Sequence, residues 1–160
     1  MKATFMLLLT ALLFSISSYE QEMKFEGTHP PNPEVLKLLE REGAIMDSKT
    51  NVKERDSLRS RLISKGWFYH GIDGLPISLD GLTKRQTKNQ FKQLEAKVIS
   101  ETLYQYETTA ILVSIFWQKV LDKGELKENT RSNLIVMGLE NGEWKMQADI
   151  IGMNPKIKQD

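Results

Sequence analysis

The chain has 160 residues, of which 40% are hydrophobic and 27% are charged, a composition typical of a folded globular domain and too apolar for a disordered chain. Its 22 basic and 21 acidic residues give a formal charge of +1, so nothing in the charge balance indicates nucleic acid or an anionic membrane as a partner. Cysteine is absent, which excludes disulfides, thiolate zinc sites, iron–sulfur clusters, a cysteine nucleophile and a lipid-modified cysteine.

The first 18 residues have the layout of a secretory signal. Lys2 is followed by the apolar run FMLLLTALLF over residues 5–14 and then by small, mostly polar residues. This run is shorter than the roughly 20 residues that a membrane-spanning helix needs. We therefore expect cleavage after Ser17 or Ser18 and export to the periplasm or the medium, with no stable membrane anchor afterwards. An uncleaved anchor is the alternative.

Two helices are predicted to open the folded domain, after an extended tail over residues 19–31. Asn32 is a suitable N-cap and Pro33 a suitable first helical residue, and apolar residues follow at a spacing of three or four. Asn51 and Glu54 form a capping-box pattern that begins a second helix, which Gly66 is expected to end. The domain is predicted to extend over residues 32–154, with a short C-terminal tail at 155–160.

The middle of the chain is predicted to hold a short aromatic strand and a short helix. Residues 67–70 (WFYH) form the strand, and the Asp-Gly pairs at 73–74 and 80–81 mark turns around an alternating apolar segment. Thr83 and Gln86 form another capping box, so a polar helix is expected from there to about Lys92, with Phe91 as its inward-facing anchor.

From residue 94 the pattern changes to long strands. They are predicted over residues 98–106, 110–121, 130–139 and 143–151, and the Asn141-Gly142 pair between the last two is a strong hairpin signal. Helices gathered at one end of the chain, followed by a meander of antiparallel strands, indicate an α+β architecture.

Taken together, these segments resemble the NTF2-like superfamily, in particular its SnoaL-like branch of small domains. The matching segments, in chain order, are LLERE, GWFYHGIDG, TKRQ, YQYETTAILVS and MGLENGEWKMQADI, within residues 35–154. The resemblance implies a cone in which N-terminal helices pack on a strongly curved antiparallel sheet, with a pocket inside. The superfamily includes steroid isomerases, polyketide cyclases, dehydratases, and transport and scaffold domains without enzymatic activity, so the fold alone does not define a function.

His70 and Asp149 are the two candidate catalytic residues. His70 lies at the rim of the implied cone, and histidine suits a general base because its side chain exchanges protons at ordinary pH; a partly exposed strand histidine is the alternative. Asp149 lies in the last strand, where acids are uncommon. It faces solvent by simple alternation with Lys145 and Gln147, or it is a buried carboxylate with a raised pKa if the curved sheet turns that face inward. Turn chemistry alone accounts for Asp73.

Most of the aromatic side chains are expected in the core, and Trp144 is assigned there, with an indole N–H that needs a local acceptor. Three other aromatic residues, Trp67, Tyr69 and Trp117, are expected to line the pocket. On the strand before the last, Arg131 and Asn133 face either the inside or the outside of the cone. The predicted ligand-binding residues are Trp67, Tyr69, His70, Trp117, Arg131 and Asp149.

Neither a metal nor a cofactor is expected. The sequence has no phosphate-binding glycine loop, zinc-binding helix motif, nucleophile elbow or EF-hand loop, and His29 and His70 are its only histidines. The predicted function is an exported domain that holds a small, mostly apolar molecule in its cone. The alternatives are an isomerase-, cyclase- or dehydratase-type enzyme with His70 or Asp149 as general base, and a homodimer or protein-interaction scaffold that uses the open face of its sheet.

Overall fold

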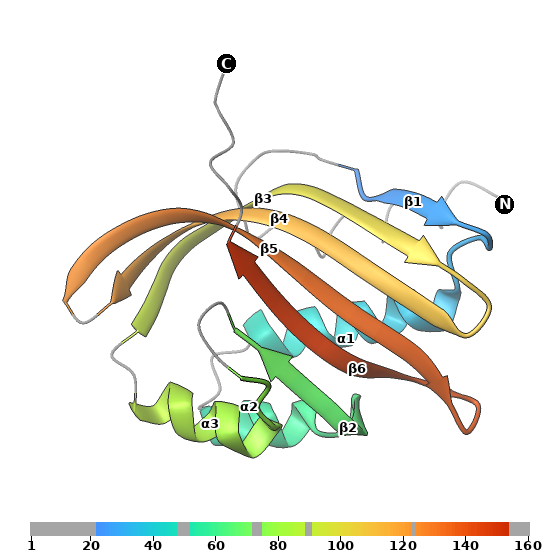
Figure 1. Cartoon of the computed structure of the whole chain (residues 1–160), viewed down its shortest axis with the longest axis horizontal. Helices are drawn as coiled ribbons and strands as arrows, with labels where there is room; N and C mark the ends of the chain where they lie inside the picture. The colour runs from blue at the N-terminus through green and yellow to red at the C-terminus, as the bar shows by residue number, and fades with distance from the viewer. Residues whose placement is uncertain (1–21, 48–51, 72–74, 89–90, 123, 154–160) are drawn as a thin grey trace, which may run out of the picture.

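The computed structural model describes residues 22–47, 52–71, 75–88, 91–122 and 124–153 (Figure 1). The predicted signal and the C-terminal tail lie outside these residues, as do Asn51 and Asp73. The helices are α1 (Pro33–Asp47), α2 (Val52–Arg59) and α3 (Leu79–Lys88). The strands are β1 (Lys24–Gly27), β2 (Ile63–His70), β3 (Phe91–Gln105), β4 (Thr109–Asp122), β5 (Glu125–Glu140) and β6 (Glu143–Met153). Within the described ranges, no helix is long and apolar enough to cross a membrane.

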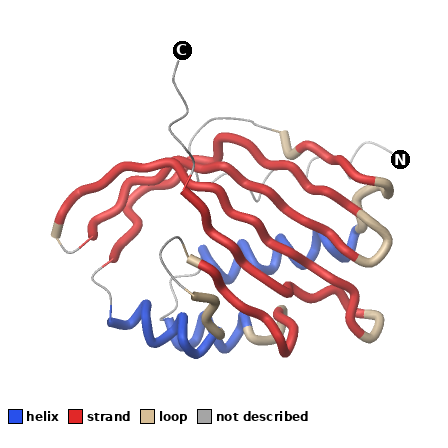
Figure 2. Tube along the Cα trace, viewed as in Figure 1, coloured by secondary structure: helices blue, strands red, loops and turns tan. Residues whose placement is uncertain are grey.

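The strands form one six-stranded sheet in the order β1-β3-β4-β5-β6-β2. β3 to β6 are an antiparallel meander, as predicted, whereas the two edge strands run parallel to their neighbours, β1 beside β3 and β2 beside β6. The sheet is strongly curved, and the three helices lie together on its inner side (Figures 1 and 2). The predicted α+β architecture, with helices packed on a curved sheet, is therefore confirmed.

The two faces of the sheet can be assigned from β4, which pairs with β5 without a bulge. Its buried residues are Ala110, Leu112, Ser114, Gln118 and Val120, which alternate along the strand with only the half-buried Phe116 interrupting the series. Because successive side chains of a strand point to opposite faces, these residues define the face that packs on the helices. We call it the concave face, and the opposite one the convex face.

The hydrophobic core lies between the helices and one end of the concave face, near the β3–β4 and β5–β6 turns. It combines apolar residues of α1, α3 and the turn between α2 and β2 with apolar residues of β2 to β6. Its buried members are Val35, Leu38, Leu62, Trp67, Leu82, Leu103, Ala110, Leu112, Met137 and Met146. Trp144, which the sequence assigned to the core, is half-buried and packs against the edge of this cluster.

Two local signals operate as predicted. The backbone N–H of Glu34 donates to Oδ1 of Asn32 at 2.9 Å, so Asn32 caps α1 and Pro33 is its first residue. Asn141 (φ 51°) and Gly142 (φ 82°) both adopt the left-handed conformation that a two-residue hairpin turn requires. These positions fix the start of α1 and the register of the last hairpin.

The second helix and the first aromatic strand have different limits from those predicted. α2 ends at Arg59 in a tight turn, in which the N–H of Leu62 donates to the carbonyl of Arg59 at 2.8 Å. The carbonyl of Leu62 then accepts from the N–H of Met146 at 2.9 Å, which brings the next residue, Ile63, into the sheet. The prediction that Gly66 ends the helix is therefore wrong, because this glycine lies inside β2.

α3 also begins and ends earlier than predicted. It starts at Leu79, where the hydroxyl of Ser78 accepts from the N–H of Gly81 at 3.3 Å, so Ser78 and not Thr83 is the cap. The helix ends at Lys88, and Phe91 begins β3 instead of anchoring the helix. Residues 24–27 of the predicted tail form β1. The start of β3 and the position of β1 are set by pairing with distant strands, which local sequence patterns do not encode.

Candidate functional site

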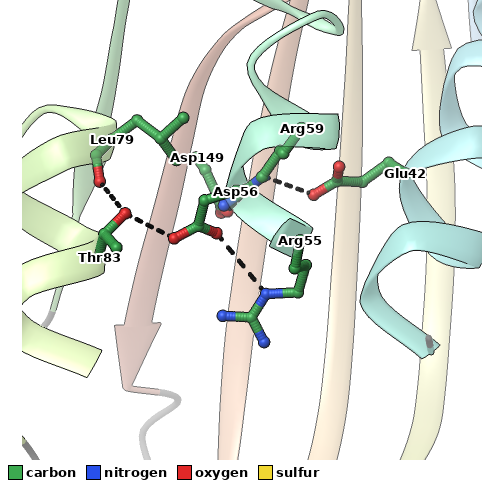
Figure 3. A network of polar contacts seen from close by, with 7 residues as sticks. All are labelled: Glu42, Arg55, Asp56, Arg59, Leu79, Thr83 and Asp149. Atoms are coloured by element: carbon green, nitrogen blue, oxygen red, sulfur yellow. Dashed lines mark hydrogen bonds and ion pairs between the residues drawn. The ribbon is translucent and has the colours of Figure 1, made fainter. Parts of the chain in front are cut away.

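A buried ion-pair network joins two helices to the sheet. Arg59 of α2 lies between Glu42 of α1 and Asp149 of β6 (Figure 3). Its Nη2 donates to Oδ2 of Asp149 at 2.9 Å, and its Nε lies 2.8 Å from Oε1 of Glu42, close enough for an ion pair although the N–H is not aligned for a hydrogen bond. The guanidinium also lies over the ring of Trp67, 4.9 Å from its centroid.

The network holds two carboxylates against one guanidinium, so it carries a net negative charge when both acids are ionised. Burial raises the pKa of both the Glu42 and the Asp149 carboxyl groups, against the opposing effect of the Arg59 charge. The repulsion between the two carboxylates raises the pKa of Glu42 further. Oε2 of Glu42 and Oδ1 of Asp149 are buried and have no hydrogen-bond partner among the described residues. The acids are therefore poised to hold a proton.

A second polar contact connects α2 to α3 beside this network (Figure 3). Asp56 is buried, and its Oδ2 lies 2.5 Å from the hydroxyl of Thr83, which is also 2.9 Å from the carbonyl of Leu79. The hydroxyl has one proton, so it donates to one of these oxygens at a time. On the other side of the carboxylate, Arg55 Nε lies 3.6 Å from Asp56 Oδ1. This contact fixes α3 relative to Arg59.

Polar side chains continue from Asp149 along the concave face. Burial raises the pKa of Asp149, and the side-chain amide of Asn133 on β5 acts against this rise; Oδ1 of Asn133 is itself buried without a partner among the described residues. Two residues further along β5 is Arg131, whose Nε donates to Oδ1 of Asn129 at 3.2 Å. The same Asn129 oxygen accepts from Nε2 of the buried Gln118 at 3.0 Å. The face thus presents a row of amides, with the guanidinium of Arg131 between Asn133 and Asn129.

Apolar side chains flank this row. Phe116 is the cross-strand neighbour of Arg131, and Val98 is the neighbour of Phe116 on the next strand. Ile151 lies beside Asn133 on β6. Phe116 and Ile151 are half-buried, and Val98 keeps 42% of its surface exposed. Solvent therefore reaches this part of the concave face, which the helices leave partly uncovered.

The structure places four of the six predicted ligand-binding residues on the concave side of the sheet. Tyr69 is the register partner of Asp149 across the β2–β6 pair, and both lie on the concave side with Arg131. Trp67 is on the same side, but it is buried in the core beneath Arg59.

The remaining two lie elsewhere. His70 follows Tyr69 in β2, so its side chain is on the convex side. Trp117 also faces the convex side, where Lys97 lies 5.7 Å from its ring centroid. Neither contributes to the concave site.

Sequence reasoning named Asp149 but not its partners, Glu42 and Arg59. One signal was available for Glu42. It lies four residues after Leu38 and seven after Val35, on the stripe of α1 that faces the core. A carboxylate in that stripe predicts a buried cationic partner. No comparable local signal distinguishes Arg59 from the other basic residues of a short, strongly polar helix. Among the described residues, no three His, Cys, Asp or Glu side chains are placed to hold a metal ion.

No family model and no curated protein matches the sequence, but solved structures match the fold. An NTF2-like superfamily protein from Salmonella enterica serovar Typhimurium has a TM-score of 0.57 and 13% identity, over 79% of this chain and 94% of that one. A candidate ketosteroid isomerase from Shewanella frigidimarina has a TM-score of 0.56 and 12% identity, over 80% and 99%. A candidate Ca/calmodulin-dependent kinase II association domain from Exiguobacterium sibiricum has a TM-score of 0.60 and 13% identity, over 81% and 99%.

The molecule is thus an α+β domain in which a curved sheet carries a partly polar concave face. Its fold is the NTF2-like fold, as the resemblance in the sequence implied. At these identities the likeness establishes the fold, and the function has to be argued from the residues of the concave face.

Proposed function

We propose that this chain is an exported NTF2-like domain whose concave face binds a small, mostly apolar molecule that carries an anionic group. Arg131 is the observation that carries the proposal. Its guanidinium lies on the half-buried concave face, donates to the neutral Asn129, and has no carboxylate partner among the described residues. A guanidinium that is partly removed from water is stabilised by an anion, and its remaining N–H donors match a carboxylate in geometry.

The surroundings of Arg131 account for the apolar part of the ligand. Phe116, Val98 and Ile151 offer apolar surface that remains partly open to solvent. Binding sites for small molecules are commonly lined by such side chains, with a few polar groups that set orientation. The amide of Asn133 adds one such polar group beside Ile151. A medium-chain fatty acid has the matching combination of an apolar body and one carboxylate.

The experiment compares a fatty acid with its methyl ester, which has the same chain and no charge. Isothermal titration with the wild-type chain is expected to show tighter binding of the acid. Arg131→Gln is expected to abolish the difference between acid and ester, whereas Lys24→Gln, at the opposite edge of the sheet on β1, keeps it. Equal binding of acid and ester by the wild type, or an unchanged preference in Arg131→Gln, would contradict the proposal.

Export is tested separately, by mass spectrometry of the protein from its native host. A mature chain that begins at Ser18 or Tyr19 supports cleavage of the signal after Ser17 or Ser18. A chain that begins at Met1 and stays in the cytoplasm would overturn this part of the proposal without affecting the binding site.

Asp149 favours a second candidate function, general base catalysis. Its Oδ1 is buried without a partner among the described residues, burial raises its pKa, and Tyr69 is its register partner. Exchange of the α-protons of a cyclic ketone in D2O, followed by NMR, measures proton abstraction directly. We expect Asp149→Asn to abolish exchange above the buffer rate and His70→Ala to retain it, because His70 is on the convex side. No exchange in the wild type would reject this function for such ketones.

A further inference from the structure

A groove of about 380 Å³ lies between α1 and the sheet beside the β5–β6 turn, away from the part of the concave face that carries Arg131 and Asn133. One wall is the outward side of α1, with Lys37 and Arg41. The other wall is formed by Arg61 in the α2–β2 turn and by Trp144 and Lys145 at the start of β6. Three segments that are far apart in the sequence therefore meet in one surface depression, and none of them contributes Arg131 or Asn133.

Hydrogen bonds to two backbone carbonyls hold the second wall in place. Nζ of Lys145 donates to the carbonyl of Arg61 at 3.1 Å, and the N–H of Met146 donates to the carbonyl of Leu62 at 2.9 Å. Leu62 and Leu38 line the groove from below and are both buried in the core. The turn that carries Arg61 is thus fixed to the sheet on one side and to the core on the other. The fold therefore determines the position of this wall of the groove.

The charges of the groove are unbalanced. Four basic residues and two acidic residues line it, in a chain whose net charge is only +1. Each acid is already paired, Glu34 with Lys37 at 2.7 Å and Glu143 with Lys145 at 3.0 Å. Arg41 and Arg61 have no carboxylate partner among the described residues, so the groove presents two free guanidinium groups above an apolar base.

We infer that this groove binds a small molecule with a flat apolar body and one carboxylate or phosphate group. Arg41 and Arg61 supply the N–H donors for the anion, because guanidinium groups bind carboxylate and phosphate oxygens in a bidentate manner. Trp144 packs against the core and also lines the groove, so its indole provides the surface for the apolar body. This site is independent of the function proposed for the concave face.

The test uses phenyl phosphate and benzoate as probes, with benzyl alcohol as the uncharged analogue and inorganic phosphate as the anion without a ring. Titration of the full chain is followed by NMR through the indole N–H of Trp144, which Trp144→Phe assigns. We expect both aromatic anions to shift this signal, with weaker binding of inorganic phosphate and of benzyl alcohol. Arg41→Gln and Arg61→Gln are each expected to weaken binding about tenfold, the effect of losing one charge-assisted hydrogen bond.

Two controls make the result specific to the groove. Lys24→Gln removes a positive charge at the far edge of the sheet, and Arg131→Gln removes a guanidinium on the concave face; in both variants the Trp144 signal is expected to shift at the same probe concentrations as in the wild type. Binding that Arg41→Gln and Arg61→Gln leave unchanged, binding of benzyl alcohol as tight as that of benzoate, or no shift of the Trp144 signal overturns the inference. Loss of probe binding in Arg131→Gln alone also overturns it, by assigning the anion to the concave face.

Discussion

The two ends of the concave face are built from the same strands, but the side chains of one end are apolar and those of the other end are polar. Near the hairpin turns, β3, β4 and β5 contribute Leu103, Leu112 and Met137, which are buried against the helices. Further along β5 on the same face, the side chains are Asn133 and Arg131. Packing alone favours apolar residues at both ends, because burying amides and charges costs free energy. The proposed ligand site accounts for the polar end, and the stability of the core accounts for the apolar end.

The ion-pair network lies where the two ends meet. Asp149 is the register partner of Ile135, which packs on the core, and Asn133 is the next residue of β5 on the same face. Arg59 approaches this point from α2 and Glu42 from α1. The network thus separates the packed end from the polar end and contacts both, through Trp67 on one side and Asn133 on the other.

The largest effect is expected from Arg59→Met, which keeps an aliphatic stem of similar length. It leaves Glu42 and Asp149 buried without their common cation, and loss of one partner of a buried ion pair costs about 3–5 kcal/mol in the free energy of unfolding. Urea denaturation at pH 7 measures this cost. Arg61→Met, an exposed arginine two residues further on, is the control and is expected to change stability by less than about 0.5 kcal/mol. Similar stabilities for the two variants would show that the network has no structural role.

The packed end is tested by a matched pair of leucines on β3. Leu103 is fully buried, whereas Leu94 keeps 48% of its surface exposed. Leu103→Ala is expected to lower the free energy of unfolding by about 2–5 kcal/mol, through lost burial and the cavity that remains. Leu94→Ala is expected to cost less than about 1 kcal/mol. Equal losses in thermal or urea denaturation would contradict the assignment of the core to one end of the sheet.

The fold was predictable where a local interaction decides the structure. Asn32 caps α1, and the Asn141-Gly142 pair closes the last hairpin, because both determine the backbone within a few residues of themselves. The start of β2 at Ile63 and the existence of β1 were not predictable in this way. Both depend on pairing with strands that follow much later in the chain, β6 and β3.

The orientation of Asp149 shows why the site was harder to predict than the fold. Simple alternation places it on the same face as Lys145 and Gln147 and therefore in solvent. A bulge intervenes, because Met137 pairs with Met146 whereas Val136 pairs with Ala148. The extra residue reverses the alternation, so Asp149 shares a face with Met146 and is only 8% exposed. The interpretation that placed Asp149 in solvent is wrong, and the buried alternative is correct.

The pH dependence of stability tests the charge state of the network. Because burial raises the pKa of Asp149, the folded state keeps its proton at pH values where the unfolded chain, with a pKa near about 3.9, has lost it. The folded state then binds more protons, so the contribution of Asp149 to the free energy of unfolding falls as the pH rises above about 4. The stability of Asp149→Asn relative to wild type is therefore expected to increase from pH 4 to pH 7. A decrease over this range, in urea denaturation of both chains, would show a lowered pKa.

Arg131→Gln is expected to have the smallest effect on stability. It tests most directly whether the polar end of the concave face differs in role from the packed end. The side chain lies at the polar end, makes one hydrogen bond to Asn129, and has no ion pair among the described residues. Glutamine retains a donor and much of the aliphatic stem, so the free energy of unfolding is expected to change by less than about 0.5 kcal/mol. The same variant is expected to lose the preference for a fatty acid over its methyl ester. A loss of 2 kcal/mol or more, on the order of the core substitutions, would mean that Arg131 holds the sheet together and that the polar end is part of the structural core.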